Sequence, residues 1–264
     1  MELATWFETL WKDYRSLAPR VSSIKAMLED RGETVLNDHI AFRTYDIGPI
    51  ALDALAPRLE ALGYRRFDDY RFEAKRVRAT AFVHPTNAFP RIFLSELETS
   101  RFPASIQDEI RSLVHQAKGL PDNEDVFVLG RPWSLDLSIY SKLAEVSEYA
   151  AWVAAHGIRP NHFTVAVNAL TTFEGLPDLL DFVESAGFAL NTAGSRIKGS
   201  PADFLEQGST LADQIDVDFG GQVLRVPSCY YEFAFRHRMP DGALFNGFVE
   251  ASADKIFEST NRAE

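Results

Sequence analysis

The chain has 264 residues, of which 46% are hydrophobic and 12% aromatic, and 27 basic against 38 acidic residues give a net charge of −11. This composition is typical of a globular protein and excludes a disordered or fibrous chain. The acidic balance argues against nucleic acid as a partner, because nucleic-acid-binding proteins present a basic face. No apolar run is long enough to span a membrane, and the single cysteine, Cys229, excludes an internal disulfide. We therefore expect a cytoplasmic location.

Hydrophobic periodicity and turn residues predict a regular series of elements. In the first half these are two helices within 1–31, a strand at 37–46, a helix at 51–67 that Gly63 closes and a strand follows, and strands at 78–84 and 91–98. Helices at 103–119 and 141–157 separate the halves. The second half begins with a strand at 161–170 and a helix at 173–190, and continues with strands at 213–220 and 222–237.

The two halves repeat one pattern about 123 residues apart. NDHIAF, from residue 37, and NHFTVA, from residue 161, each place Asn and His at the start of an apolar strand. Each strand leads to a helix that ends in a glycine followed by an aromatic residue, and then to more strands. The repeat predicts a single α+β domain over 1–264, with two degenerate βαβββ modules that form a concave sheet or partial barrel. Its parts are N-terminal helices at 1–36, modules at 37–100 and 159–250, and a helical insertion at 101–158.

Polar side chains share one face on each of three predicted strands, because side chains on a strand alternate between its two faces. The polar faces consist of His39, Ala41 and Arg43 on the first strand, His162, Thr164, Ala166 and Asn168 on the second, and Tyr230, Glu232, Ala234 and Arg236 on the third. The opposite faces are apolar and are expected to pack on helices. So many ionisable groups are unusual for an ordinary solvated strand.

If these faces converge, His39, His162 and Glu232 supply two imidazoles and a carboxylate. Such a set holds a divalent metal such as iron, nickel, zinc or manganese, and leaves coordination positions open for substrate or dioxygen. Arg43 lies on the same face about 13 Å further along the strand and could bind the carboxylate of an acidic substrate. Thr164, Tyr230 and Arg236 share these faces and are further candidates for substrate binding.

Other interpretations of these residues stay open. A histidine on a strand is more often a hydrogen-bonded structural residue than a metal ligand, and Glu232 could form a salt bridge with Arg236 or Arg43. Glu96 ends the fourth strand of the first module, so a site of two histidines and two glutamates is conceivable. The face of Glu96 is otherwise apolar, and we therefore expect this residue to lie away from the metal.

NDHIAFRTYD (37–46), the NHFT strand, EQGSTLAD (206–213) and YYEFAFR together resemble the 2-oxoadipate dioxygenase/decarboxylase family of the vicinal oxygen chelate superfamily. The resemblance covers roughly residues 1–245. It implies a vicinal oxygen chelate-like fold and Fe(II) held by His39, His162 and Glu232. It also implies that Arg43 binds the distal carboxylate of the 2-oxo acid. The implied reaction converts 2-oxoadipate to 2-hydroxyglutarate with uptake of O2 and release of CO2.

Two alternatives to this function remain at the level of the sequence. The superfamily also contains glyoxalase-type lyases and isomerases, which use two histidines and two glutamates with nickel or zinc, and Glu96 keeps that possibility open. A binding protein of the same fold could instead sequester a small molecule without a metal. That protein would not require His39, His162 and Glu232 to face one another.

Overall fold

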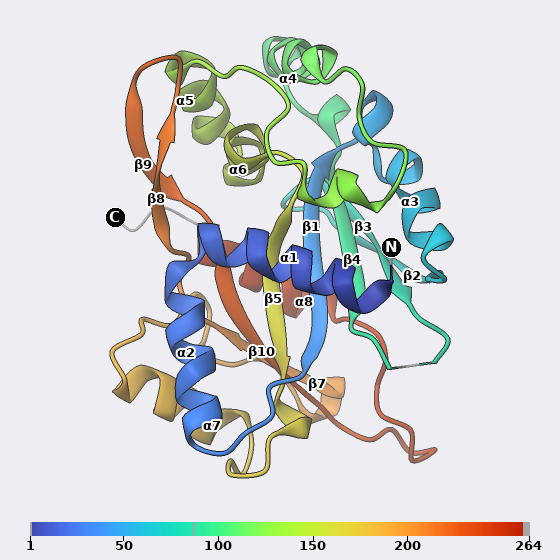
Figure 1. Ribbon diagram of the computed structural model, residues 1–264, viewed down its shortest axis with the longest axis vertical. Helices are drawn as coiled ribbons and strands as arrows, with labels where there is room; N and C mark the ends of the chain where they lie inside the picture. Colours follow the sequence, from blue (N-terminus) through green and yellow to red (C-terminus); the bar gives the residue numbers. More distant parts are fainter. Residues whose placement is uncertain (1, 87, 261–264) are drawn as a thin grey trace.

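A curled eight-stranded sheet forms the centre of the computed structural model, which describes residues 2–86 and 88–260 (Figure 1). The strand order is β2-β3-β4-β1-β5-β10-β7-β6. The strands of this sheet are β1 (Asn37–Tyr45), β2 (Arg65–Phe72), β3 (Val77–Val83), β4 (Arg91–Leu97), β5 (Pro160–Ala166), β6 (Lys198–Ser200), β7 (Leu205–Ser209) and β10 (Tyr230–Arg236). A separate two-stranded sheet pairs β8 (Gln214–Asp218) with β9 (Val223–Pro227).

Helices cover both faces and one end of the curled sheet. They are α1 (Leu3–Leu17), α2 (Pro19–Asp30), α3 (Leu52–Ala61), α4 (Ala104–Gln116), α5 (Leu137–Val146), α6 (Glu148–His156), α7 (Leu176–Ser185) and α8 (Glu250–Ile256). Within the described ranges, no helix has the length and apolar character that crossing a bilayer requires.

The sheet consists of two halves with the same connectivity. Strands β2-β3-β4-β1 form one half, and β6-β7-β10-β5 form the other in the corresponding order. The first strand of each half runs parallel to its last strand, β1 to β4 and β5 to β10, and the halves join where β1 pairs antiparallel with β5. This arrangement confirms the α+β fold of two βαβββ modules, with additional helices before and between them. The residue boundaries given above for the modules and the insertion stay predictions.

Three local features differ from the sequence-based expectation. The helix expected at 141–157 is two helices, because the side chain of Ser147 accepts a hydrogen bond from the Ala150 amide and begins α6. The strand expected at 222–237 is also two, since the chain turns at Ser228, whose amide binds the Asp213 carbonyl. Strands β6 and β7 and helix α8 are absent from the sequence-based prediction; α8 has only 7 residues, too few for a clear helical period.

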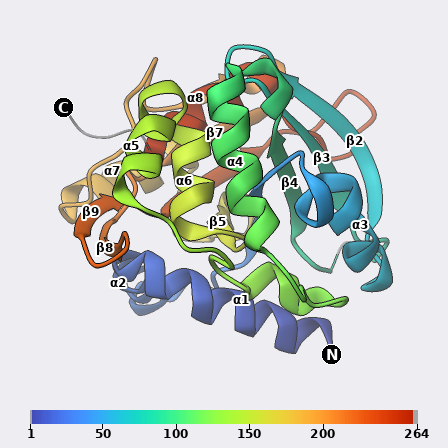
Figure 2. The ribbon, with the colours of Figure 1, turned by 90° about the horizontal axis from the view of Figure 1, so that it is seen from above.

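The convex, apolar face of the sheet packs on α1. The ring of Phe163 on β5 lies 5.1 Å from that of Trp11 and 4.8 Å from that of Tyr14, both on α1. Viewed from above, α1 and α2 lie on one side of the sheet and α8 on the other (Figure 2). The apolar faces therefore pack on helices as predicted, and the polar faces point toward the opposite, concave side.

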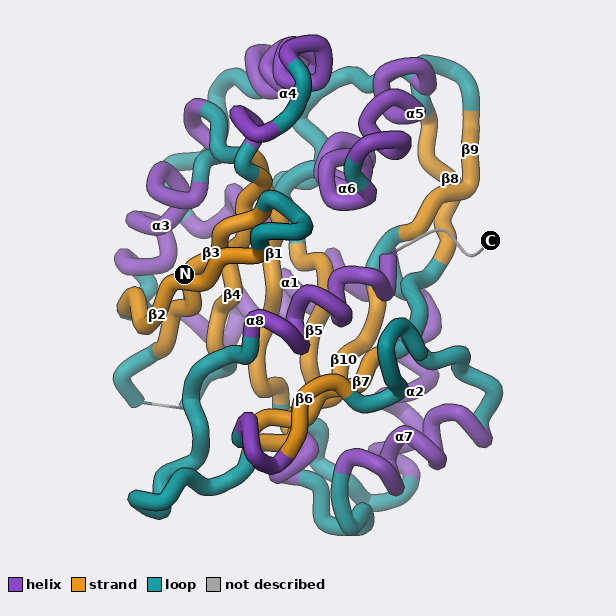
Figure 3. Tube along the Cα trace, turned by 180° about the vertical axis from the view of Figure 1, so that it is seen from behind, coloured by secondary structure: helices purple, strands orange, loops and turns teal. Residues whose placement is uncertain are grey.

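The C-terminal segment, residues 248–260, covers the concave side. Its helix α8 contacts β2 at one end of the sheet and β6 and β7 at the other, and it crosses the sheet on the face opposite α1 (Figure 3). The ring of Phe248 lies 4.8 Å from His39 and 4.7 Å from Phe93. The polar residues of the concave face are consequently buried beneath this segment.

Candidate metal centre

Two imidazoles and one carboxylate converge at the centre of the concave face. Strand β5 lies between β1 and β10, and the register places both His39 and Glu232 beside Thr164. The Nε2 atom of His39 lies 3.5 Å from Oε1 of Glu232, and Nε2 of His162 lies 3.2 Å from Oε2. One ligand atom from each of the three buried residues lies within 4.8 Å of the others, and in the described chain no other such group occurs.

The outer nitrogen of each imidazole is held by the preceding residue. His39 Nδ1 lies 2.8 Å from Asp38 Oδ1, and His162 Nδ1 lies 3.0 Å from Asn161 Oδ1. Burial alone would raise the pKa of Asp38, but its pairing with Arg236 holds that pKa well below its usual range. An ionised Asp38 accepts the Nδ1 proton of His39 and leaves the Nε2 lone pair directed at the centre, as in other carboxylate–histidine–metal arrangements.

The structure gives Arg236 a different role from the substrate binding expected from the sequence. Its guanidinium donates to both oxygens of Asp38, at 2.7 and 2.8 Å, and to the carbonyls of Phe245 and Gly247. Every guanidinium nitrogen is therefore used within the protein. Arg236 orients Asp38, which in turn orients His39.

The electrostatics of the three residues suit a bound cation. Burial raises the pKa of Glu232, an effect that His39 and the Gln207 amide oppose. Burial also lowers the pKa of His162 well below its usual value, and the neighbouring His39 and Arg43 lower it further. Oε2 of Glu232 accepts no hydrogen bond from any described residue. Two imidazoles beside a buried carboxylate with an unused oxygen form a donor set that fits a divalent metal, and the lowered pKa of His162 keeps its imidazole neutral.

Glu96 does not belong to this group. Its carboxylate accepts a hydrogen bond from the Leu52 amide at 2.6 Å, at the start of α3, and pairs with Arg78. In the β1–β4 register Glu96 lies beside Thr44, so it points to the face opposite the ligands. The expectation that Glu96 lies away from the metal agrees with this placement.

Arg43 lies on the same face of β1 as His39 and is fully buried, with 1% of its surface exposed. Its Nη1 donates to Glu148 Oε1 at 2.7 Å and to Thr260 Oγ1 at 3.1 Å. Its Nε and Nη2 have no hydrogen-bond partner among the residues the structure describes. The arginine thus presents two unused donors within the covered face.

Tyr230 and Thr164 also lie beside the ligands. The Tyr230 ring stacks on His162 at 4.6 Å, and its buried hydroxyl lies near Arg43 but makes no hydrogen bond of normal geometry with any described residue. Burial raises the pKa of Tyr230 well above its usual value, while the neighbouring Arg43 acts in the opposite direction. Thr164 Oγ1 lies 3.1 Å from His39 Nε2. Among the residues predicted to bind substrate, Arg43 and Tyr230 keep polar atoms without a partner in the described chain, whereas the polar atoms of Arg236 and Thr164 contact other residues.

Sequence reasoning assigned no role to several residues that contact the site. Gln207 on β7 donates to Glu232 Oε1 at 2.6 Å, and its own carbonyl oxygen has no partner in the described structure. It lies in EQGSTLAD, a segment that contributes to the resemblance but that gave no functional signal by itself. Phe248 lies in the loop before α8, and Glu148 begins α6, a helix whose sequence shows no polar face, so no local signal identifies either residue.

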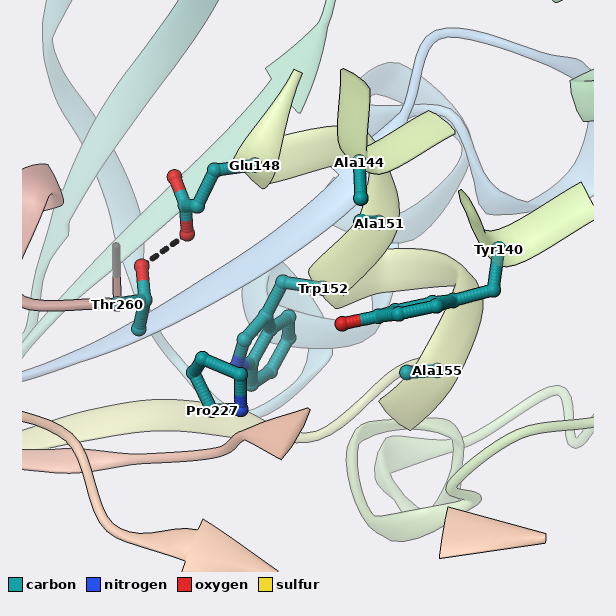
Figure 4. A pocket seen from close by; sticks show the side chains of 8 residues that line it. All are labelled: Tyr140, Ala144, Glu148, Ala151, Trp152, Ala155, Pro227 and Thr260. Atoms are coloured by element: carbon teal, nitrogen blue, oxygen red, sulfur yellow. Dashed lines mark hydrogen bonds between the residues drawn. The ribbon is translucent and has the colours of Figure 1, made fainter. Parts of the chain in front are cut away.

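A cavity of about 230 Å³ lies next to the partners of Arg43. Figure 4 shows the side chains that line it, and a hydrogen bond joins Glu148 to Thr260 at one side. The lining residues are Tyr140, Ala144, Glu148, Ala151, Trp152, Ala155, Pro227 and Thr260. The cavity is mainly apolar, apart from the polar pair that also binds Arg43.

Comparison with known proteins identifies relatives over most of the chain. A family model described as 2-oxoadipate dioxygenase/decarboxylase matches residues 8–129 and 125–245. The chloroplastic 2-oxoadipate dioxygenase/decarboxylase of Arabidopsis thaliana is 34% identical over 253 residues, covering 84% of this chain and 67% of the plant protein. Because the name of this relative places it in a plastid, a cytoplasmic location for the present chain stays a prediction.

Solved structures show the same fold. Hydroxyglutarate synthase from Oryza sativa, in complex with 2-oxoadipate, has a TM-score of 0.90 and 32% identity, covering 97% of this chain and 91% of that one. A protein from Shewanella frigidimarina, described as a hydrolase, has a TM-score of 0.89 and 41% identity, covering 94% and 98%. The curled sheet therefore occurs in proteins of related sequence.

Proposed function

This chain belongs to the 2-oxoadipate dioxygenase/decarboxylase family, and on that premise we propose that it converts a dicarboxylic 2-oxo acid, 2-oxoadipate in the first instance, to 2-hydroxyglutarate with uptake of O2 and release of CO2. The observation that carries the proposal is the convergence of His39, His162 and Glu232 at one buried point, with no second carboxylate among them. Three ligands on one side of a metal leave positions free for a chelating substrate and for dioxygen.

Fe(II) is the metal we propose for this centre, with nickel, zinc and manganese as alternatives. His39, His162 and Glu232 would hold it, and the unused oxygen of Glu232 supports this assignment. Bound iron would supply dioxygen activation next to the 2-oxo acid. Asp38 and Asn161 keep the imidazoles in the orientation that ligation requires.

Arg43 is the residue we propose for the distal carboxylate of the substrate. Its Nε and Nη2 donors are buried without a partner in the described chain, and because buried donors are nearly always hydrogen-bonded, a ligand at this edge would account for them. The Tyr230 hydroxyl, also buried and unpaired in the described chain, lies near Arg43 and on the same strand as Glu232. A dicarboxylic 2-oxo acid placed between the metal centre and Arg43 would bind the metal at one end and the unused donors of Arg43 at the other.

The cover over the site also fits this chemistry. Phe248, in the C-terminal segment, lies against His39, and all three ligands are buried. A site closed to bulk water strengthens the electrostatic interactions within it and protects a reactive oxidant from side reactions. The residues of this segment therefore exclude water, and Arg43 and the ligands bind and orient the substrate.

The experiment that tests this function begins with protein purified without oxygen. Its metal content is measured, and oxygen uptake is then followed with a panel of 2-oxo acids. We expect uptake that depends on Fe(II) and is fastest with dicarboxylic acids. Turnover of a hemithioacetal without oxygen would favour a glyoxalase-type enzyme. Hydrolysis without oxygen uptake would favour the description given to the Shewanella protein, and binding without metal or turnover would favour a sequestering protein.

A further inference from the structure

The Arg43 guanidinium is fixed through one of its nitrogens. Nη1 donates to Glu148 Oε1 at 2.7 Å and to Thr260 Oγ1 at 3.1 Å, and Thr260 Oγ1 in turn donates to Glu148. These three side chains come from β1, from the first residue of α6 and from the C-terminal segment. We call Glu148 and Thr260 the Arg43 clamp.

The plane of the guanidinium is fixed as well. Its central carbon lies 5.0 Å from the ring centre of Tyr149 and 5.4 Å from those of Trp152 and Phe257. Rings on several sides leave an arginine little freedom to rotate, and they stabilise its charge. The clamp and the rings together determine which edge of Arg43 remains open.

The open edge is the one that suits a carboxylate. Nε and Nη2 lie side by side on one edge of a guanidinium, and their two N–H bonds are parallel, which matches the two oxygens of a carboxylate. In Arg43 these two donors lack a partner in the part of the chain that the structure describes, whereas Nη1 is fully engaged. The pattern of used and unused donors is therefore the pattern expected of a bidentate receptor.

We propose that Glu148, assisted by Thr260, is a positioning residue that holds Nη1 of Arg43 so that the Nε–Nη2 edge faces the substrate and selects dicarboxylic over monocarboxylic 2-oxo acids. This inference rests on the proposed function. Glu148 borders the cavity of Figure 4 and keeps 23% of its side-chain surface exposed. The alternative role for Glu148 is as an internal carboxylate that binds Arg43 until the substrate carboxylate displaces it. The experiment distinguishes this role from positioning.

The test measures binding by calorimetry on the Fe(II)-loaded protein without oxygen, so that no turnover occurs. Two probes are compared, 2-oxoadipate and 2-oxohexanoate, which differ in the distal carboxylate. The variants are Glu148→Ala, Glu148→Gln and Thr260→Val, and the control is Glu145→Ala, which removes an exposed carboxylate from the neighbouring helix α5. Metal content and thermal unfolding are recorded for each protein.

If the clamp positions Arg43, Glu148→Ala and Thr260→Val each weaken 2-oxoadipate binding about tenfold or more and leave 2-oxohexanoate binding unchanged. Glu148→Gln keeps an oxygen that accepts from Nη1 and should retain most of the wild-type preference, and Glu145→Ala should match wild type. In steady-state assays the loss should fall on KM more than on kcat, because the clamp acts on binding.

Several results would contradict the inference. Tighter 2-oxoadipate binding in Glu148→Ala would show that Glu148 is a carboxylate that the substrate displaces from Arg43. An equal loss of affinity for 2-oxoadipate and 2-oxohexanoate would show that Glu148 has a purely structural role. A wild-type preference that survives in both Glu148→Ala and Thr260→Val would overturn the clamp while leaving the proposed function intact. A wild-type protein without any preference for 2-oxoadipate would contradict the proposed function itself.

Discussion

Phe93 occupies in the first module the position that Glu232 occupies in the second. Glu232 lies beside Thr164, two residues after His162, and Phe93 lies beside Ala41, two residues after His39. The Phe93 ring packs on Phe248 instead of offering a ligand. The repeat therefore supplies two histidines but one carboxylate, and this asymmetry leaves the centre with three ligands.

The first prediction concerns the two glutamates. Glu232→Gln should abolish both metal binding and oxygen-dependent decarboxylation, because it removes the anionic ligand. Glu96→Gln should keep both but lower the free energy of unfolding by about 1–3 kcal/mol, since Glu96 pairs with Arg78 and caps α3. Metal analysis and thermal unfolding of the two variants check this. Loss of metal in Glu96→Gln would restore the four-ligand, glyoxalase-type interpretation.

The second prediction concerns Arg43. Arg43→Ala should leave the metal content unchanged and weaken binding of dicarboxylic 2-oxo acids by tens to thousands-fold, about 2–5 kcal/mol for a lost buried bidentate partner. Binding of a monocarboxylic 2-oxo acid provides the comparison. A variant that loses metal without any selective loss of dicarboxylates would show that Arg43 supports the ligands instead.

The third prediction concerns the residue behind His39. Asp38→Asn should weaken metal affinity about 10–100-fold, as is usual when the partner of a ligating histidine is changed. It should also lower the melting temperature, because Arg236 would lose its buried counter-charge. A metal titration followed by calorimetric unfolding measures both effects. Unchanged metal affinity would mean that the Asp38–Arg236 pair serves the fold alone.

The sequence allowed the central site to be predicted because strand alternation is a local rule. His39, His162 and Glu232 lie on the predicted faces, and the repeat placed the two histidines in corresponding positions. The partner of His39 could not be found this way. Asp38 adjoins His39 and should point to the other face, but the register with β5 shifts between Asn37 and His39, and the two side chains meet.

Contacts between distant segments could not be predicted from the sequence either. Arg236 was placed on the polar face, but its pairing with Asp38 joins strands 198 positions apart. The C-terminal segment gave no periodic signal, although Phe248 and Thr260 complete the cover and the Arg43 clamp. Such contacts are set by the closure of the sheet and not by local pattern.

The fourth prediction concerns pH. Burial lowers the pKa of His156 to about 4, opposed by its hydrogen bond to the Pro227 carbonyl and assisted by Arg159, Arg131 and Arg43. Between about pH 6.5 and pH 4 the unfolded chain binds this proton and the folded protein does not, so stability falls as the pH falls through that window. The full effect of this residue is about 3 kcal/mol.

His156→Gln tests this directly. The glutamine amide can still donate to Pro227 but does not titrate, so the loss of stability between about pH 6.5 and pH 4 should become shallower. His115→Gln, at an exposed position of α4, is the matched control and should follow wild type. Parallel curves of melting temperature against pH for wild type and His156→Gln would contradict the assignment.

The proposed dioxygenase reaction is best tested by measuring O2 uptake, CO2 release and 2-hydroxyglutarate formation together, in Fe(II)-loaded protein supplied with 2-oxoadipate. We expect the three quantities to agree, with about one O2 consumed and one CO2 released per product molecule, and we expect none of them with Glu232→Gln. Product formation without O2 uptake, or activity that persists after removal of the metal, would contradict it.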